Sequence, residues 1–135
     1  MKKIDKYNSM TYLKVKKAVE GIVKVPDIAH EKKSRILVIA RQVYMAITEE
    51  MLRDKWRYSS CGYYINRDHS DIVHNINLFR NHINDPSWSG FWIYILACEK
   101  LEHYSDIYEK YDQGELVFTS TVPFPWRYKV LKPNE

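Results

Sequence analysis

The sequence has few of the features that mark secreted, membrane-spanning or metal-dependent proteins. Only two of its 135 residues are cysteines, Cys61 and Cys98, and they form no metal-binding pattern. Isolated cysteines of this kind are typical of reduced thiols in the cytoplasm. The apolar run 91–98 is far too short to span a bilayer, and the first residues lack the pattern of a signal peptide. We therefore expect a cytoplasmic protein that crosses no membrane and binds no metal, nucleotide or other cofactor.

The excess of positive charge is also small. A formal net charge of +4 does not by itself indicate nucleic-acid binding. The distribution is more informative, because the first third of the chain is rich in basic residues: Lys14, Lys16, Lys17, Lys24, Lys32, Lys33, Arg35 and Arg41. A single lysine of this set is most simply part of a solvated helix surface. The segment 32–35 stands directly before a long helix and is the better candidate for phosphate contacts.

Internal repeats and low-complexity segments are absent, and the length fits one domain with a single core. Apolar residues recur at helical spacing along most of the chain, which predicts an all-α fold. The predicted helices cover 9–23, 34–55, 58–64, 68–83 and 88–111. Pro26, 85–87 and Gly114 mark the breaks between or after them. Beyond Gly114, we expect a strand or an extended arm over 116–122, and an extended segment over 122–126 because of its two prolines.

The segment 65–83 is the most informative one, because it predicts a polar turn followed by an amphipathic helix. Asp68 is a good N-cap, and Asp71 follows three residues later, where an acidic side chain can bond back to the N–H of the cap. The core-facing positions are apolar: Ile72, Ile76, Phe79 and Ile83. The polar side chains that packing does not need are expected on the outer face: Arg67, His69, Ser70, His74 and Asn75.

The preceding segments complete a helix-turn-helix layout. A long periodic helix within 34–57 is followed by 58–65, which is just long enough for a short helix and a turn. The order of long helix, short helix, turn and second helix is that of the helix-turn-helix motif. In this motif the N-terminus of the second helix enters the major groove of DNA, where short polar side chains reach base edges. The sequence therefore predicts a recognition helix that begins near Asp68.

Two motifs resemble those of a known family. The run Ala40-Arg41-Gln42-Val43-Tyr44-Met45, followed by Arg67-Asp68-His69-Ser70 and His74, is similar to the C-terminal duplex-DNA-binding domain of the DnaA replication initiators. That family shows an Ala-Arg-Gln-x-x-Met helix start, an Ile-Gly-x-x-Phe turn and an Arg-Asp-His-[Ser/Thr]-Thr-Val-x-His recognition helix. The likeness extends over residues 10–84. It implies a Trp-repressor-like helix-turn-helix bundle for residues 1–85, with 86–135 as an added helix and extended tail.

The resemblance also implies roles for individual residues. Arg67 and His69 would contact the major groove, Ser70 would contact a base or a phosphate, and Asp68 would contact a base while capping the helix. Arg41 matches an arginine that the family places in the adjacent minor groove, and His74 matches a histidine of the recognition helix. Together with the basic segment, the predicted DNA-binding residues are Arg41, Arg67, Asp68, His69, Ser70, Asp71, His74, Lys32, Lys33 and Arg35.

For several of these residues, a purely structural role is the alternative to DNA contact. Arg67 and His69 can be an ordinary turn arginine and surface histidine. Arg41 can form a salt bridge on the helix surface with Asp68 or a nearby glutamate. Asp71 is better explained as a capping partner than as a base contact, since an acid repels phosphates. His74 fits a structural role as well as a DNA-facing one.

Three departures from the family limit what the resemblance implies. Asp71 stands where the family has its second threonine. Cys61-Gly62 stands for the Ile-Gly element, and the turn after it is about one residue short. The chain contains no G-x-x-x-x-G-K-[ST] loop, so it lacks the ATP-binding module of an initiator. We therefore expect a DNA-binding protein linked to replication initiation or its control, and not an ATP-driven initiator acting alone.

The sequence leaves two other functions open and disfavours two more. A transcriptional regulator with an unrelated operator would use the same fold, and a protein-interaction module would keep the scaffold without binding DNA. A metal site at His69, His74 and His82 is disfavoured, because spacings of five and eight residues do not bring imidazoles together on one helix face. No set of nucleophile, base and orienting residue is visible, so we expect no enzyme.

The helix predicted over 88–111 has a wide apolar surface near its start: Trp88, Phe91, Trp92, Ile95 and Leu96. A helix of this kind either packs deeply against the first helices or pairs with a second copy of the chain. Packing within the chain is the expectation, since the earlier helices also have apolar residues to cover. A homodimer stays open as the alternative, with 124–126 as a clasp.

Overall fold

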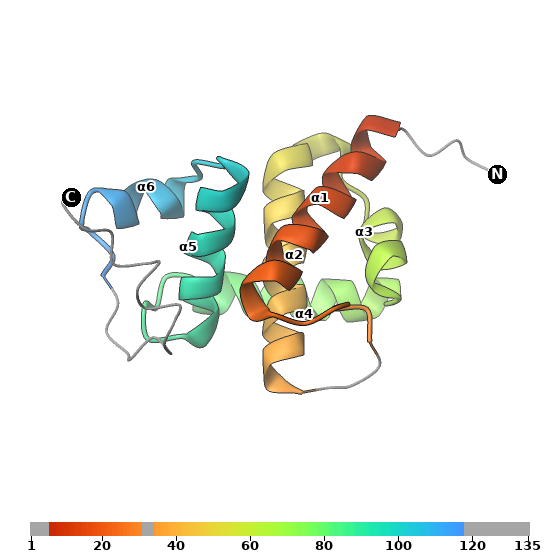
Figure 1. Ribbon diagram of the computed structural model, residues 1–135, viewed down its shortest axis with the longest axis horizontal. Coiled ribbons are helices and arrows are strands. Elements are labelled where there is room, and N and C mark those ends of the chain that lie inside the picture. Colours follow the sequence, from red (N-terminus) through yellow and green to blue (C-terminus); the bar gives the residue numbers. More distant parts are fainter. Residues whose placement is uncertain (1–5, 31–33, 118–135) are drawn as a thin grey trace.

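The computed structural model describes residues 6–30 and 34–117, and within these ranges every regular element is a helix (Figure 1). The predicted all-α fold is therefore confirmed for the described part of the chain. The helices are α1 (Lys6–Val23), α2 (Arg35–Leu52), α3 (Tyr58–Ile65), α4 (His69–His82), α5 (Ser89–Leu101) and α6 (Asp106–Asp112), with a short 3₁₀ helix (Arg53–Lys55) after α2. The first four agree with the predicted helices to within three residues at each end.

The helix α2 is the central element of the fold. It contacts α1, α4 and α5, and α1 crosses it on one side (Figure 1). Ten consecutive residues of α2, 39–48, are buried. Two polar groups of this helix have partners inside the core: the Tyr44 hydroxyl donates to the Cys61 carbonyl at 2.9 Å, and Thr48 Oγ1 accepts from Trp56 Nε1 at 3.0 Å. Buried polar groups are tolerated only with such partners, which fix α2 against the start of α3.

Both cysteines are free and buried. Burial raises the pKa of the Cys61 thiol to about 12 and raises the pKa of Cys98 well above its usual value, because the interior disfavours a thiolate. The two thiols therefore serve as small core side chains.

The turn between α3 and α4 is tight because Gly62 lies directly beneath it. Asn66 ends α3 in the left-handed region with φ 55°, and the N–H of Arg67 donates to the Gly62 carbonyl at 2.9 Å. A Cβ atom on Gly62 would lie 2.2 Å from the carbonyl oxygen of Arg67. The close approach of these two backbones thus requires glycine. It leaves three residues, 66–68, between the two helices.

The helix α5 is a core element. All residues from Phe91 to Cys98 are buried, and the helix packs against α1 and α2. The expectation that the apolar surface of this segment is covered within the chain is confirmed. One continuous hydrophobic cluster includes side chains from both sides of the predicted boundary at residue 85.

The prediction of a single helix over 88–111 is wrong. The helix α5 ends at Leu101, Glu102 adopts a left-handed conformation with φ 53°, and the N–H of His103 donates to the Cys98 carbonyl at 2.8 Å. A new helix, α6, then begins after Ser105, whose hydroxyl accepts from the N–H of Tyr108. Ser105 followed by Asp106 is an N-cap signal inside the expected helix. A new helix begins at this cap although the hydrophobic periodicity continues through it.

A cluster of polar side chains joins this connection to α2. Glu50 Oε1 accepts from the Tyr94 hydroxyl at 2.7 Å and lies 2.9 Å from His103 Nε2. The Tyr94 and Ser105 hydroxyls are 2.5 Å apart. The C-terminal helices are therefore held to α2 by directional bonds as well as by apolar packing.

Two further expectations concern the end of the chain and the membrane. The strand or arm predicted over 116–122 lies mostly outside the described residues, and the extended segment 122–126 with its clasp lies wholly outside them. Leu116 and Val117, which are described, form no strand. In the described ranges, no helix combines the length and the apolar character that a bilayer span requires.

Candidate nucleic-acid interface

The helix α4 begins with a well-formed cap. Asp68 has an extended backbone, and its Oδ1 accepts from the N–H of Asp71 at 2.9 Å and from the Ser70 hydroxyl at 3.0 Å. The bond from the Asp71 N–H lowers the pKa of the Asp68 carboxyl, because it stabilises the charged form. The predicted N-cap is confirmed. On the rear of α4, Ile72, Ile76 and Phe79 are buried, so the apolar face predicted from the spacing is the one that packs.

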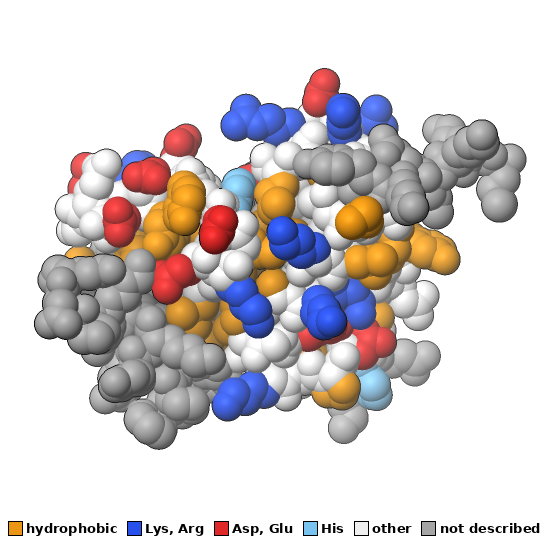
Figure 2. All heavy atoms as spheres, turned by 45° about the horizontal axis from the view of Figure 1, so that its top comes forward, with side chains coloured by type: hydrophobic (Ala, Val, Ile, Leu, Met, Phe, Trp, Pro, Cys, Tyr) orange, Lys and Arg blue, Asp and Glu red, His pale blue; other side chains and the backbone are white. Residues whose placement is uncertain are grey.

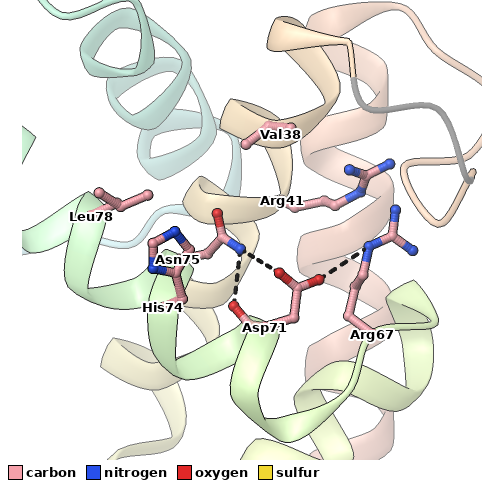
Figure 3. A pocket seen from close by; sticks show the side chains of 7 residues that line it. All are labelled: Val38, Arg41, Arg67, Asp71, His74, Asn75 and Leu78. Atoms are coloured by element: carbon pink, nitrogen blue, oxygen red, sulfur yellow. Dashed lines mark hydrogen bonds and ion pairs between the residues drawn. The ribbon is translucent and has the colours of Figure 1, made fainter.

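The Asp71 side chain pairs with two neighbouring side chains, those of Arg67 and Asn75. Its carboxylate lies 3.4 Å from Arg67 Nε and accepts from Asn75 Nδ2 at 2.8 Å (Figure 3). Asn75 Oδ1 in turn accepts from Gln42 Nε2 at 2.9 Å. Among the described contacts of Asp71, none is the capping-box bond to the N–H of Asp68. Asp71 therefore acts as an internal counter-ion for Arg67 and a link to α2.

The expectation that Asn75 and Arg67 lie free on the outer face is wrong. Asn75 is half-buried between α4 and Gln42. The Arg67 side chain is only 15% exposed, and its guanidinium donates to the carbonyls of Ile65, Asn66 and His30. Asn75 comes three residues after the buried Ile72 and four before the buried Phe79, which places it at the border of the apolar face, and this spacing is the sequence signal for its partial burial.

Arg41 is buried in α2, with only 4% of its surface exposed. Its Nε donates to the Ile28 carbonyl at 2.6 Å, and Nη2 donates to the His30 carbonyl. Burial, followed by the nearby Arg67 charge, lowers the pKa of Arg41. At this degree of burial the side chain does not project into solvent. It holds the loop between α1 and α2 against the start of α4.

His69, Ser70 and His74 are exposed, as the sequence predicts. The His69 ring stacks on Tyr58, with ring centroids 4.5 Å apart, so its position at the start of α4 is fixed by α3. His74 lies one turn further along, at the rim of a pocket of about 250 Å³ between α2 and α4. Figure 3 shows this pocket, with Arg41, Arg67 and Asp71 on one side and His74 and Leu78 on the other.

The basic segment is described only in part. Lys32 and Lys33 lie outside the described residues. Arg35 is exposed at the first position of α2, directly after Ser34, whose hydroxyl caps that helix. At the other end of the segment, the His30 carbonyl accepts from Arg67 Nη2 at 3.0 Å. The described part of the loop before α2 is therefore fixed at His30 to the turn that precedes α4.

The predicted set omits further exposed polar residues on α4, namely Asn77, Arg80, Asn81 and His82. Helical spacing from Ser70 and His74 was the available signal for Asn77 and Asn81. No group of His, Cys, Asp and Glu side chains that could hold a metal ion is present in the described ranges.

Comparison of the chain with protein-family models, with curated proteins and with solved structures finds no match.

Proposed function

We propose that this protein binds double-stranded DNA with sequence preference, and that α4 is its recognition helix in the major groove. The observation that carries the proposal is the composition of the exposed face of α4. Its exposed side chains are those of His69, Ser70, His74, Asn77, Arg80, Asn81 and His82. None of them is a carboxylate, and the half-exposed Asp71 is paired with Arg67. A groove lined by phosphates favours a helix face of this kind.

The geometry of the two helices supports the same function. The α3–α4 turn is short, Gly62 fixes the approach of the two backbones, and the rear of α4 is anchored in the core. The N-terminal turn of α4 is exposed, with His69 and Ser70 on it. A helix-turn-helix protein needs this combination, because the recognition helix must be rigid and must project its first turns into the groove.

Contacts with the DNA backbone are assigned to the loop before α2. Arg35 is exposed there, and the sequence adds Lys32 and Lys33. Arg67 and Arg41 both bond to His30 at the edge of this loop. We therefore assign to these two arginines the task of positioning the loop beside α4. Direct base contacts are assigned first to His69, Ser70 and His74.

The charge of the C-terminal helices α5 and α6 indicates how the molecule would be oriented on DNA. Residues 86–117 carry six acidic and only two basic side chains, the acidic ones being Glu99, Glu102, Asp106, Glu109, Asp112 and Glu115. In Figure 2 acidic side chains gather over the α5–α6 end of the visible face, while Lys and Arg are spread over the rest. An acidic end is repelled by phosphates, so the molecule would approach DNA with α4 and keep α6 away.

The biological setting depends on which sequence is bound. The DnaA-like motifs favour replication initiation or its control, and a preference for DnaA-box-type sequences would support it. A transcriptional regulator would prefer an unrelated operator near its own gene.

The experiment is a selection of bound duplexes from a random pool at physiological salt. We expect enrichment of a defined site by the wild-type chain. His69→Ala should lose about 1–3 kcal/mol of discrimination at one or two positions of that site. Arg35→Ala should weaken binding to all duplexes alike, and Lys110→Ala on α6 is the control for a lost positive charge. Absence of any enriched sequence, or equal losses on specific and random DNA for His69→Ala, would contradict the proposal.

A further inference from the structure

The outer face of α4 has a continuous stripe of four polar residues, Ser70, His74, Asn77 and Asn81, here called the outer stripe. The spacings of four, three and four residues place them within about 60° of arc on an α-helix. All four are exposed, and the buried Ile72, Ile76 and Phe79 lie on the opposite side of the helix. The side chain that points most directly away from the core is therefore polar at every turn of α4.

The residues on either side of the outer stripe are engaged by other parts of the molecule. His69 stacks on Tyr58, and His82 stacks on Trp88 with ring centroids 5.5 Å apart. The Arg80 guanidinium binds both carboxylate oxygens of Glu49, at 2.9 and 2.8 Å. These contacts direct the flanking side chains toward α2, α3 and the start of α5. His69, Arg80 and His82 are still exposed, but the outer stripe is the part of α4 that points most directly into solvent.

The two asparagines in the outer stripe have the chemistry that adenine requires. An amide donates through its NH₂ group and accepts through its oxygen, and this pair matches N7 and N6 on the major-groove edge of adenine. Asn77 Oδ1 accepts one bond, from Arg80 Nη1 at 3.4 Å, which leaves a second lone pair and the NH₂ group. The Asn81 side chain forms no hydrogen bond to another described residue.

We propose that Asn77 and Asn81 are specificity-determining residues, each reading an adenine in the major groove beyond the positions contacted by the first turn of α4. This inference rests on the proposed DNA-binding function and extends it. From Ser70 to Asn81 the helix rises by roughly 16 Å, which corresponds to about five base pairs along the duplex. Asn77 and Asn81 are one turn apart, so their adenines should be about two base pairs apart.

The test repeats the duplex selection with Asn77→Ala, Asn81→Ala and Asn81→Gln. Both alanine variants should fold as well as the wild type, because alanine is the best helix former and both sites are exposed. Each should lose its own adenine preference by roughly 5- to 150-fold and keep the preference at the other positions. Asn81→Gln should retain adenine, since glutamine offers the same donor and acceptor. Gln113→Ala, which removes an exposed amide at the C-cap of α6, is the matched control and should change nothing.

The outcomes separate the inference from the proposed function. A wild-type chain that enriches no sequence contradicts both. A wild-type chain that enriches a site, with adenine preferences that survive both alanine substitutions, overturns the inference and leaves the DNA-binding function standing. Loss of adenine by Asn81→Gln to the same extent as by Asn81→Ala contradicts recognition through the amide group.

Discussion

Arg67 Nη2 donates to the carbonyl oxygen of His30, 3.0 Å away and 37 residues earlier in the chain. Arg41 donates to the same oxygen from α2. One carbonyl thus joins the loop before α2, the core helix α2 and the turn that precedes α4. The DNA-contacting elements that we propose are held in one rigid arrangement by this junction.

The first prediction concerns Arg41. Arg41→Lys keeps the charge but cannot reproduce the bonds to Ile28 and His30 from one planar group, so the free energy of unfolding should fall by about 1–3 kcal/mol. Urea unfolding measures this loss. Unchanged stability combined with weaker DNA binding would instead indicate that Arg41 reaches the minor groove.

The second prediction concerns Gly62. A methyl group there would collide with the Arg67 carbonyl, which belongs to the backbone of the turn and cannot move away alone. Gly62→Ala should therefore lower the free energy of unfolding by at least about 2 kcal/mol. Ser59→Ala, at an exposed position of the same helix, should change stability by no more than about 0.5 kcal/mol. Similar small effects in both variants would show that the turn is looser than described.

The third prediction concerns Asp71. Asp71→Asn keeps an acceptor for Asn75 but removes the charge that neutralises Arg67. Because the pair is partly exposed, stability should fall by less than about 1 kcal/mol. DNA binding should tighten, and the slope of log affinity against log salt should steepen by up to about one, since one more positive charge faces the phosphates.

Asp112→Asn is the matched control, because it removes the same charge from an exposed position on α6, a helix that packs against α5. An equal gain in affinity from both variants would mean that Asp71 acts only through the net charge. Weaker binding by Asp71→Asn would mean that Arg67 needs its counter-ion in order to position α4.

The fourth prediction concerns pH. The pKa of Asp68 is lower in the folded state, chiefly because the carboxylate accepts from the N–H of Asp71. Its contribution to stability is therefore complete above the unfolded pKa of about 3.9 and is lost as the pH falls through the lower folded value. Asp68→Asn keeps a good cap but removes this titration. Unfolding measured between pH 2 and pH 6 should depend less steeply on pH in the variant, and identical profiles would contradict the assignment.

Most of the helices and the N-cap of α4 could be predicted from the sequence alone. Helical spacing identified α1 to α4, and Asp68 carries a local N-cap signal that does not depend on the rest of the fold. The break at Glu102 was missed because a left-handed glutamate has no sequence signature, and the cap at Ser105 was hidden within a strong apolar pattern.

The candidate site was predicted less completely, because its geometry depends on contacts between distant segments. The bond from Arg67 to His30 and the link from Asn75 to Gln42 join residues 37 and 33 positions apart. No local pattern reveals such pairs, so Arg67 and Asn75 were expected on the outer face. Burial of Arg41 likewise follows from the path of the loop before α2, which the sequence alone does not specify.

Amide NMR, recorded while the chain is titrated with the enriched duplex, maps the contact surface and shows whether α4 binds the DNA. We expect the largest shifts on the first turn of α4, on the outer stripe and on Arg35, with α6 unaffected. Shifts concentrated on α5 and α6, or no shifts at all, would contradict the assignment of α4 as a recognition helix.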